Sequence, residues 1–452
     1  MQRWITIGLI CLIQWAVILA QSGIFSENPW TERVRWLGLF CLCALVLPAR
    51  GARARRFSAA DLFAGMLLLL ALTSVWDTPY QQTALLRTIS VILLYVAVFW
   101  SLWHFADQAG EEIILRSLGW CLGLCLLGGL LAARTGFVSA WQADGRFRGL
   151  MPNPNSVGLL GAIAFPLLLT QAIERRRWMD RVFVLSAAAS VLLSGSRTSA
   201  VSCAFATTLI LARAGMGRGL AVLLVVGTLA GALLTFRPWE QSEGYSGTML
   251  FDNPLSRLSF KDDTLMGGGR FEMWPVAVDA IKQSPLLGHG FGTEEFWMDE
   301  AGLSMEEFKI HQGKYMHNSY LGLTYQLGLV GAAMLFIPLW WLTFKAALRL
   351  LRRQLTLRQS GYVAMLITGL IAAGAESWIY SVGNAFCFPF WTAIMLLIRS
   401  LANDRRRIGA NYTAPRAAAK SELGNPIVAA LPRAGILGEP PPGTSARGRS
   451  SS

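Results

Sequence analysis

The chain alternates long apolar runs with short charged or Gly/Pro-rich connections along most of its length. Helices built from runs of this length cross the ~30 Å hydrocarbon core of a bilayer. We therefore expect an all-α integral membrane protein with about twelve transmembrane helices. The predicted spans are 4–20, 36–49, 60–76, 88–105, 115–133, 156–173, 182–195, 198–213, 219–236, 318–344, 360–380 and 383–402.

The number of spans depends on two segments. The run 36–49 is barely long enough to cross a bilayer, and Ser194-Gly195-Ser196-Arg197 interrupts the apolar stretch 182–213. We interpret this stretch as a tight helical hairpin, with one broken helix as the alternative. The hairpin gives an even number of spans and so predicts both termini on the same side.

Positive charge supports this topology, because basic residues gather in every second loop and short basic loops stay in the cytoplasm. These clusters lie at 50–56, 175–181, 213–218, 345–358 and 405–407. The topology therefore has cytoplasmic N- and C-termini. This topology, together with attraction to anionic lipid, accounts for the net charge of +13. The charge therefore does not indicate nucleic acid as a partner.

Composition agrees with a membrane protein, since only 15% of the residues are charged and 54% are hydrophobic. We interpret residues 1–20 as a retained anchor. A cleavable signal peptide is the alternative, but Ile18 fits poorly three places before a cut after Ala20. All seven cysteines lie in apolar runs, so packing is expected of them rather than disulfides or metal binding.

Three regions are expected along the chain. Residues 1–133 form N-terminal transmembrane helices, and residues 134–402 form a second membrane domain that includes a long outer loop, 237–317. Residues 403–452 are rich in Arg, Ala, Pro, Gly and Ser. This composition buries too little apolar area to fold, so it predicts a disordered cytoplasmic tail.

One helix is expected inside the outer loop. Phe271, Trp274, Val278 and Ile281 recur there at helical spacing. This pattern predicts a short amphipathic helix lying over the membrane surface.

Four polar clusters fall on the outer side of this topology, each directly before a predicted helix. The first turn of a helix has unpaired N–H groups and partial positive charge, which together bind anions. Arginine adds a planar fork of donors that matches phosphate oxygens. The clusters therefore predict a pyrophosphate site, although an isolated arginine at a helix end is more often an interfacial anchor. They are Arg146-Phe147-Arg148-Gly149 with Asn153-Pro154-Asn155, Ser194-Gly195-Ser196-Arg197, Gly267-Gly268-Gly269-Arg270, and His317-Asn318-Ser319-Tyr320.

Other polar side chains on the same side are candidates for catalysis or substrate binding. His317 opens a helix, where a neutral imidazole serves as a general base; an interfacial anchor is the alternative. Glu376 is expected inside the span 360–380 near its outer end, where a carboxylate is a functional candidate or an arginine's partner. Asn153 and Asn155 either cap a helix or bind sugar hydroxyls.

A metal site is the less favoured interpretation of the histidines. His289, His311 and His317 lie in or beside the outer loop, but the chain has no metal-ligand spacing such as HExxH. We therefore expect no metal and no cofactor.

Over residues 140–335 the chain resembles the O-antigen ligase and O-antigen polymerase superfamily of bacterial envelope glycosyltransferases. The order and shared outer face of several short motifs carry this resemblance. They are Arg146-x-x-Gly149 followed by Asn153-Pro154-Asn155, then Ser196-Arg197, Gly269-Arg270 with Trp274, Pro285-Leu286-Leu287-Gly288-His289-Gly290, and His317-Asn318-Ser319-Tyr320 leading into Gly328-Leu329-Val330-Gly331.

The resemblance implies a lipid-carrier-dependent (GT-C-like) glycosyltransferase fold in the bacterial inner membrane, with a large periplasmic loop over the active site. Members transfer a glycan from undecaprenyl pyrophosphate to an acceptor hydroxyl at the periplasmic face, apparently without metal or nucleotide sugar. Ligation to a lipid and polymerisation of a glycan both remain open, as does the oligomeric state.

The resemblance also implies roles for single residues. Arg197 and Arg270 would hold the pyrophosphate, His317 would activate the acceptor, and Arg146 would assist. We expect the remaining polar candidates to bind substrate; they are Asn153, Asn155, Asn318 and Glu376.

Two other classes of function compete with a transferase. An exporter of polysaccharide or lipid needs polar residues through the bilayer midplane, whereas the polar clusters here gather on one face. A signalling or assembly scaffold places its important residues in the basic tail and cytoplasmic loops. The transferase therefore remains the preferred hypothesis.

Overall fold

The computed structural model describes residues 2–20, 30–46, 57–136, 139–142, 145–215, 270–300 and 315–404. Contacts group residues 1–400 into one unit and 401–452 into a second, and the account below concerns the first. The predicted span 219–236 and the tail beyond 404 lie outside the described residues. The described helices include α1 Gln2–Leu19, α2 Trp30–Val46, α3 Ala59–Thr73, α4 Gln81–Tyr95, α5 Trp103–Ala109, α6 Glu111–Thr135, α7 Pro154–Arg175, α8 Trp178–Ser194, α9 Arg197–Arg213, α11 Arg270–Gln283, α12 Trp297–Glu300, α13 Ser319–Leu351 and α14 Leu357–Ala373, with a further helix over 387–404.

The protein is an integral membrane protein, and the part of it that the structure describes is helical. Within the described residues, extended backbone pairs at an isolated bridge between Trp141 and Phe147. Five helical stretches among them are long and apolar enough to cross a bilayer; they are Ala59–Asp77, Gln81–Ala109, Glu111–Thr135, Pro154–Arg175 and Ser319–Leu351. Helix α3 exposes Leu62, Met66 and Leu69, an apolar surface that lipid satisfies. A total of twelve spans stays a prediction.

The hairpin predicted over 182–213 is confirmed. Helices α8 and α9 are separate, and Gly195 between them takes a left-handed φ of 65°. Glycine adopts this conformation without the steric cost of a Cβ. The turn therefore ends α8 and lets α9 begin at Arg197.

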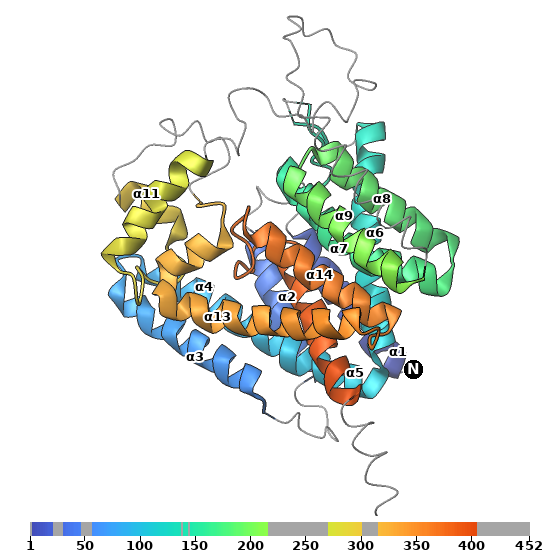
Figure 1. The fold of residues 1–452 in the computed structure, drawn as a ribbon, viewed down its shortest axis with the longest axis horizontal. Coiled ribbons are helices and arrows are strands. Elements are labelled where there is room, and N and C mark those ends of the chain that lie inside the picture. Colours follow the sequence, from blue (N-terminus) through green and yellow to red (C-terminus); the bar gives the residue numbers. More distant parts are fainter. Residues whose placement is uncertain are drawn as a thin grey trace, which may run out of the picture. The chain divides into compact units, whose positions relative to one another are not determined.

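Helix α7 packs against α6, α8, α9 and α14 (Figure 1). Small residues make its close approach to α8 and the following turn possible. A Cβ on Gly161 would lie 2.9 Å from Val191, and one on Gly158 only 2.5 Å from the Ser194 hydroxyl. Packing of this kind replaces the hydrophobic effect between helices in lipid.

Helix α13 is interrupted at Leu327 and Gly328, whose backbone angles are not helical. A break inside a membrane helix leaves backbone groups that need partners. The loop 285–290 supplies them: Leu329 N–H donates to Pro285 O at 2.8 Å, while Gly290 N–H donates to Gln326 O at 2.9 Å. Two segments that the sequence analysis noted separately, 285–290 and 328–331, thus form one unit.

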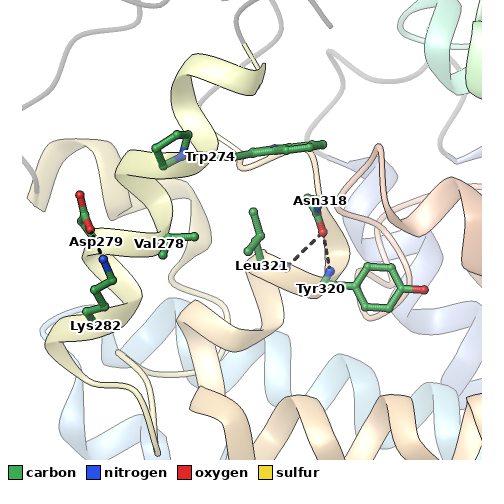
Figure 2. Close-up of a pocket in the computed structure, with 8 residues that line it drawn as sticks. Trp274, Val278, Asp279, Lys282, Asn318, Tyr320 and Leu321 are labelled. Atoms are coloured by element: carbon green, nitrogen blue, oxygen red, sulfur yellow. Dashed lines mark hydrogen bonds and ion pairs between the residues drawn. The ribbon is translucent and has the colours of Figure 1, made fainter. Parts of the chain in front are cut away.

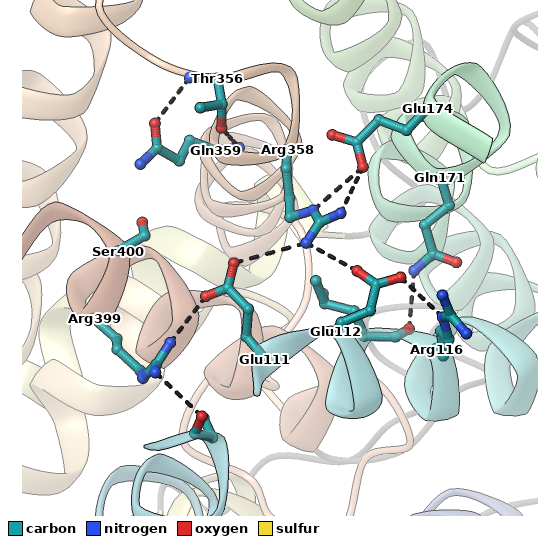
Figure 3. Close-up of polar contacts among 12 residues, drawn as sticks. Glu111, Glu112, Arg116, Gln171, Glu174, Thr356, Arg358, Gln359, Arg399 and Ser400 are labelled. Carbon is teal, nitrogen blue, oxygen red and sulfur yellow. Dashed lines mark hydrogen bonds and ion pairs between the residues drawn. The ribbon is translucent and has the colours of Figure 1, made fainter. Parts of the chain in front are cut away.

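An ionic network joins the ends of several helices, as Figure 3 shows. Arg358 at the start of α14 contacts Glu112 and Glu174, each at 2.9 Å. Arg399 contacts Asp107 at 3.0 Å and Glu111 at 3.1 Å. We call this group the ionic network; it holds α6, α7, α14 and the last helix together at one end.

The helix predicted within the outer loop is confirmed as α11, and its predicted stripe is confirmed in part. Trp274 and Ile281 pack against a buried core that contains Met273, Ala277 and Met316, whereas Val278 is 37% exposed. The hydrophobic pattern did not distinguish Val278 from the buried Ala277, because both are apolar. All seven cysteines are free thiols.

Candidate active site

Several of the polar candidates meet at the end of the bundle opposite the ionic network. Asn155 lies in the first turn of α7 and Glu174 lies near the end of this helix, whose 22 residues span about 33 Å. Arg197 starts α9, whose last residue, Arg213, donates to Leu355 O at 2.6 Å beside the start of α14. Arg197 and Asn155 therefore lie at the same end, away from Arg358.

His317 lies at the centre of this group. It directly precedes the N-cap of α13, with a left-handed φ of 48°, a conformation that costs a non-glycine residue free energy and is often found at functional sites. Its Nδ1 lies 3.0 Å from Glu376 Oε2. Its Nε2 is buried and has no hydrogen-bond partner among the described residues, so a polar ligand atom would satisfy it.

Hydrogen bonds through Asn155 connect Glu376 to Arg146. Asn155 Nδ2 donates to Glu376 Oε1 at 3.1 Å, and Asn155 Oδ1 accepts from Arg146 Nη2 at 2.7 Å. Arg146 Nε also donates to Ser194 O at 2.8 Å, in the turn before Arg197. We call Arg146, Asn155, Glu376 and His317 the polar relay.

Arg197 lies beside this relay, close enough for the positive charge of Arg146 to act on it. Two like charges held together at the first turn of α9 create a local excess of positive potential, to which the helix dipole adds. An anion bound there would relieve the repulsion between them. The arrangement suits phosphate oxygens.

Backbone contacts fix the position of Glu376 relative to His317. Ser319 Oγ donates to Glu376 O at 2.6 Å and accepts from Trp378 N–H at 3.0 Å. Asn318 N–H donates to Ser377 Oγ at 3.1 Å. The segment after α14 is therefore attached to the first turn of α13.

A second carboxylate supports this segment from the loop before His317. Glu294 is only 2% exposed; it accepts from Met316 N–H at 3.0 Å, from Tyr380 Oη at 2.6 Å and from the Ser377 hydroxyl. Burial raises the pKa of the Glu294 carboxyl, and these hydrogen bonds oppose that rise. Glu294 thus connects the segment before His317 with the segment after Glu376.

An open groove of about 580 Å³ runs beside the start of α13 (Figure 2). Trp274 of α11 lies over it and donates from Nε1 to Met316 O at 3.0 Å. Val278 and Leu321 give it apolar walls, and Asn318 adds a polar group. The groove thus reaches Asn318, the residue next to His317.

The structure confirms that each of the four polar clusters precedes or begins a helix. It corrects the position of Glu376, which lies three residues after the end of α14 at Ala373 rather than inside the span. The reason is that Gly374 ends this helix earlier than the apolar pattern predicted. The side chain of Arg270, the first residue of α11, lies outside the described residues.

Two of the asparagines act as helix caps. Asn153 Oδ1 accepts from Ser156 N–H at 2.8 Å, and Asn318 Oδ1 accepts from Tyr320 N–H at 2.9 Å. These are the structural roles that such residues have at helix starts. Substrate binding by either asparagine stays a prediction.

The sequence analysis did not find Glu294 or Arg87. Glu294 follows a glycine-rich turn and has no periodic signal, so its burial was not evident. Arg87 lies at the edge of an apolar run, where it resembles an interfacial anchor; in the structure it donates to Gly292 O at 2.6 Å and pairs with Glu295 at 2.6 Å. Both residues hold the loop 285–296.

The metal interpretation gains no support from the described residues, which contain no group of three metal-ligating side chains. His289 instead stacks on Tyr325 with ring centroids 4.4 Å apart and contacts Ala280 O at 3.1 Å. His311 lies outside the described residues.

Comparison with known proteins identifies one part of the chain. Residues 182–336 match the family model described as O-antigen ligase. This segment runs from α8 to the middle of α13 and includes Arg197, Glu294 and His317. No match was found among the curated proteins.

Proposed function

We propose that this protein transfers a glycan from an undecaprenyl-pyrophosphate carrier to an acceptor hydroxyl, a proposal supported by the match of residues 182–336 to the family model described as O-antigen ligase. The reaction takes place at the periplasmic face of a bacterial inner membrane, with both termini in the cytoplasm. Ligation to a lipid acceptor and extension of a polysaccharide use the same chemistry.

One observation carries the proposal: Nε2 of the buried His317 has no hydrogen-bond partner within the described part of the chain, and hydrogen bonds through Glu376 and Asn155 connect this ring to Arg146, beside Arg197. A base and an anion site therefore lie together at one end of the helices. Transfer from a diphosphate carrier needs both groups.

The chemical step follows from these roles. The acceptor oxygen attacks the anomeric carbon of the donor sugar as its proton passes to Nε2 of His317. The bond from that carbon to the diphosphate oxygen breaks, and the departing diphosphate keeps the electron pair. Arg197 stabilises the growing negative charge, Arg146 assists, and Arg270 at the start of α11 is assigned to the same anion.

These cations do what a divalent ion does for other phosphate leaving groups, so transfer is expected without added metal. Asn153, Asn155 and Asn318 remain candidates for sugar contacts. An exporter is less well supported, because the polar groups of the candidate site lie at helix ends rather than along a path through the bilayer.

The test uses purified protein in detergent or liposomes with an undecaprenyl-pyrophosphate glycan and a set of glycan and lipid acceptors. Labelled product should form in the presence of a chelator, and the acceptor that becomes labelled identifies ligase or polymerase. His317→Ala should abolish transfer, whereas Arg197→Ala should raise the donor KM and lower kcat.

Two controls separate loss of chemistry from loss of structure. Each variant should enter the membrane and unfold at a temperature close to that of the native protein. His289→Gln, which changes a histidine outside the polar relay, should retain transfer. Unchanged products from both His317→Ala and Arg197→Ala would refute the proposal.

A further inference from the structure

We infer that Glu376 is a positioning residue for His317, and that Asn155, which is hydrogen-bonded to Arg146, holds Glu376 in place. This inference rests on the proposed function. Both Glu376 and Arg146 lie outside the segment 182–336 that matches the O-antigen ligase model. The inference therefore extends the site beyond that segment on either side.

The hydrogen-bonding capacities of the four groups assign the protons. An ionised carboxylate only accepts, so the nitrogen 3.0 Å from Glu376 must carry a proton. His317 Nδ1 is then a donor, and in the neutral ring Nε2 holds the lone pair. This is the tautomer that a general base at Nε2 requires.

Asparagine suits the middle position of the relay. Arginine only donates and carboxylate only accepts, so a residue between them must accept on one side and donate on the other. Asn155 does so, with Oδ1 2.7 Å from Arg146 and Nδ2 3.1 Å from Glu376. The same assignment fixes the orientation of its amide.

The relay also has the rigidity that positioning needs. Its members come from the segment before α7, the first turn of α7, the residues after α14 and the start of α13. The contacts of Ser319 with Glu376 O and Trp378 N–H fix the backbone of the last two parts. Orientation of a catalytic histidine by a carboxylate is a general device that controls its tautomer.

The first experiment replaces Glu376 by glutamine. Glutamine offers one oxygen to the two donors, Asn155 Nδ2 and His317 Nδ1, and places an NH₂ group against the other. The imidazole Nδ1 then accepts a hydrogen bond from that NH₂ group, and the ring carries its proton on Nε2. We expect kcat to fall by roughly 10²-fold or more while the donor KM changes little.

A double variant tests the relay without relying on loss of activity alone. Asn155→Asp with Glu376→Gln restores the native order: the new aspartate accepts from Arg146 and from the glutamine NH₂, and the glutamine oxygen accepts from His317 Nδ1. The number of carboxylates is unchanged. We expect kcat to recover relative to Glu376→Gln, and Asn155→Asp alone to be impaired because two carboxylates meet.

The tautomer is measured by ¹⁵N NMR of the lipid-reconstituted protein with labelled histidine. The chain has only four histidines, so His317→Gln assigns the resonance of interest. In the native protein Nδ1 should be protonated, in Glu376→Gln the proton should move to Nε2, and the double variant should return it. Glu376→Asp, which keeps a carboxylate, should retain the native tautomer and more activity than Glu376→Gln.

Two controls complete the design. Glu174→Gln makes the same chemical change at the other end of α7 and should leave the tautomer and kcat unaltered. The His289 resonance serves as an internal check of folding, because its ring stacks on Tyr325.

An unchanged tautomer and kcat in Glu376→Gln would overturn the role of Glu376, and a double variant no better than Glu376→Gln would overturn the role of Asn155. The NMR result does not depend on transferase activity. A chain that transfers no glycan but shows the expected tautomers would refute the proposed function and leave the relay intact.

Discussion

Replacement of Gly328 by alanine tests whether the broken α13 and the loop 285–290 form one unit. Gly328 has φ +61° and ψ −172°, a region that is essentially limited to glycine. A Cβ there would lie 2.1 Å from the backbone carbon of Leu286. The two segments must therefore move apart or accept strain.

The magnitude follows from these two routes. Strain at such a position costs about 1–3 kcal/mol. Separation instead loses up to four backbone hydrogen bonds between the segments, at about 1 kcal/mol each. The protein takes the cheaper route, so we expect Gly328→Ala to lower the free energy of unfolding by about 1–3 kcal/mol.

The shift in unfolding temperature can be worked from chain length. An unfolding entropy of about 2.1 cal/mol/K per residue gives roughly 0.9 kcal/mol/K for 452 residues. Gly328→Ala should therefore lower the Tm by about 1–3 °C. A thiol-reactive dye reports unfolding, because Cys121, Cys125 and Cys387 are buried and free. The same variant should lose transferase activity, since this loop leads directly to Glu294.

Gly65→Ala is the matched control. Gly65 lies in α3, where an added Cβ meets nothing within 4 Å, and alanine is the better helix former. It should not lower the Tm. Equal Tm values for the two variants would refute the close association of α13 with the loop 285–290.

Three other predictions concern Glu294, Trp274 and Arg358. Burial raises the pKa of Glu294, so the folded protein binds this proton more tightly than the unfolded chain; the resulting stability is present below the ordinary pKa of 4.5 and is lost as pH rises through the folded value. Glu294→Gln should therefore flatten the dependence of Tm on pH between 4.5 and the folded pKa of Glu294. An unchanged slope in this range would contradict the prediction. Trp274→Phe keeps a ring but removes the hydrogen bond to Met316 O, so kcat should fall while the donor KM changes less. Val278→Ala, in the same groove, is the control and should not lower kcat in this way. Arg358→Ala should lower the Tm through loss of the ionic network while active protein still transfers glycan, whereas the exposed Arg352→Ala should leave both unchanged.

Much of the fold was predictable because membrane helices are long, apolar and separated by polar turns. The hairpin at Gly195 and the helix starts at Arg197 and Ser319 have local signals, namely glycine, serine and asparagine at characteristic positions. The end of α14 was placed too late because Ala373, Gly374 and Ala375 continue the apolar pattern without continuing the helix. The twelve-span count and the three regions remain predictions.

The side chains of the candidate site could be selected from the sequence one by one, but their connections could not. His317, Asn155 and Glu376 were each selected as polar groups at one membrane face. Their hydrogen bonds to one another depend on three helices meeting, which one sequence does not encode locally. Glu294 escaped notice because its environment comes from residues more than twenty positions away, such as Ser377 and Tyr380.

Helix α7 is held at both ends, by Glu376 on Asn155 and by Arg358 on Glu174. Each residue of an α-helix adds 1.5 Å and turns the chain by about 100°. A single insertion or deletion within α7 would therefore rotate one anchor away from its partner whichever end stayed in place. This helix should accept changes of side chain along its length far more readily than any change in that length.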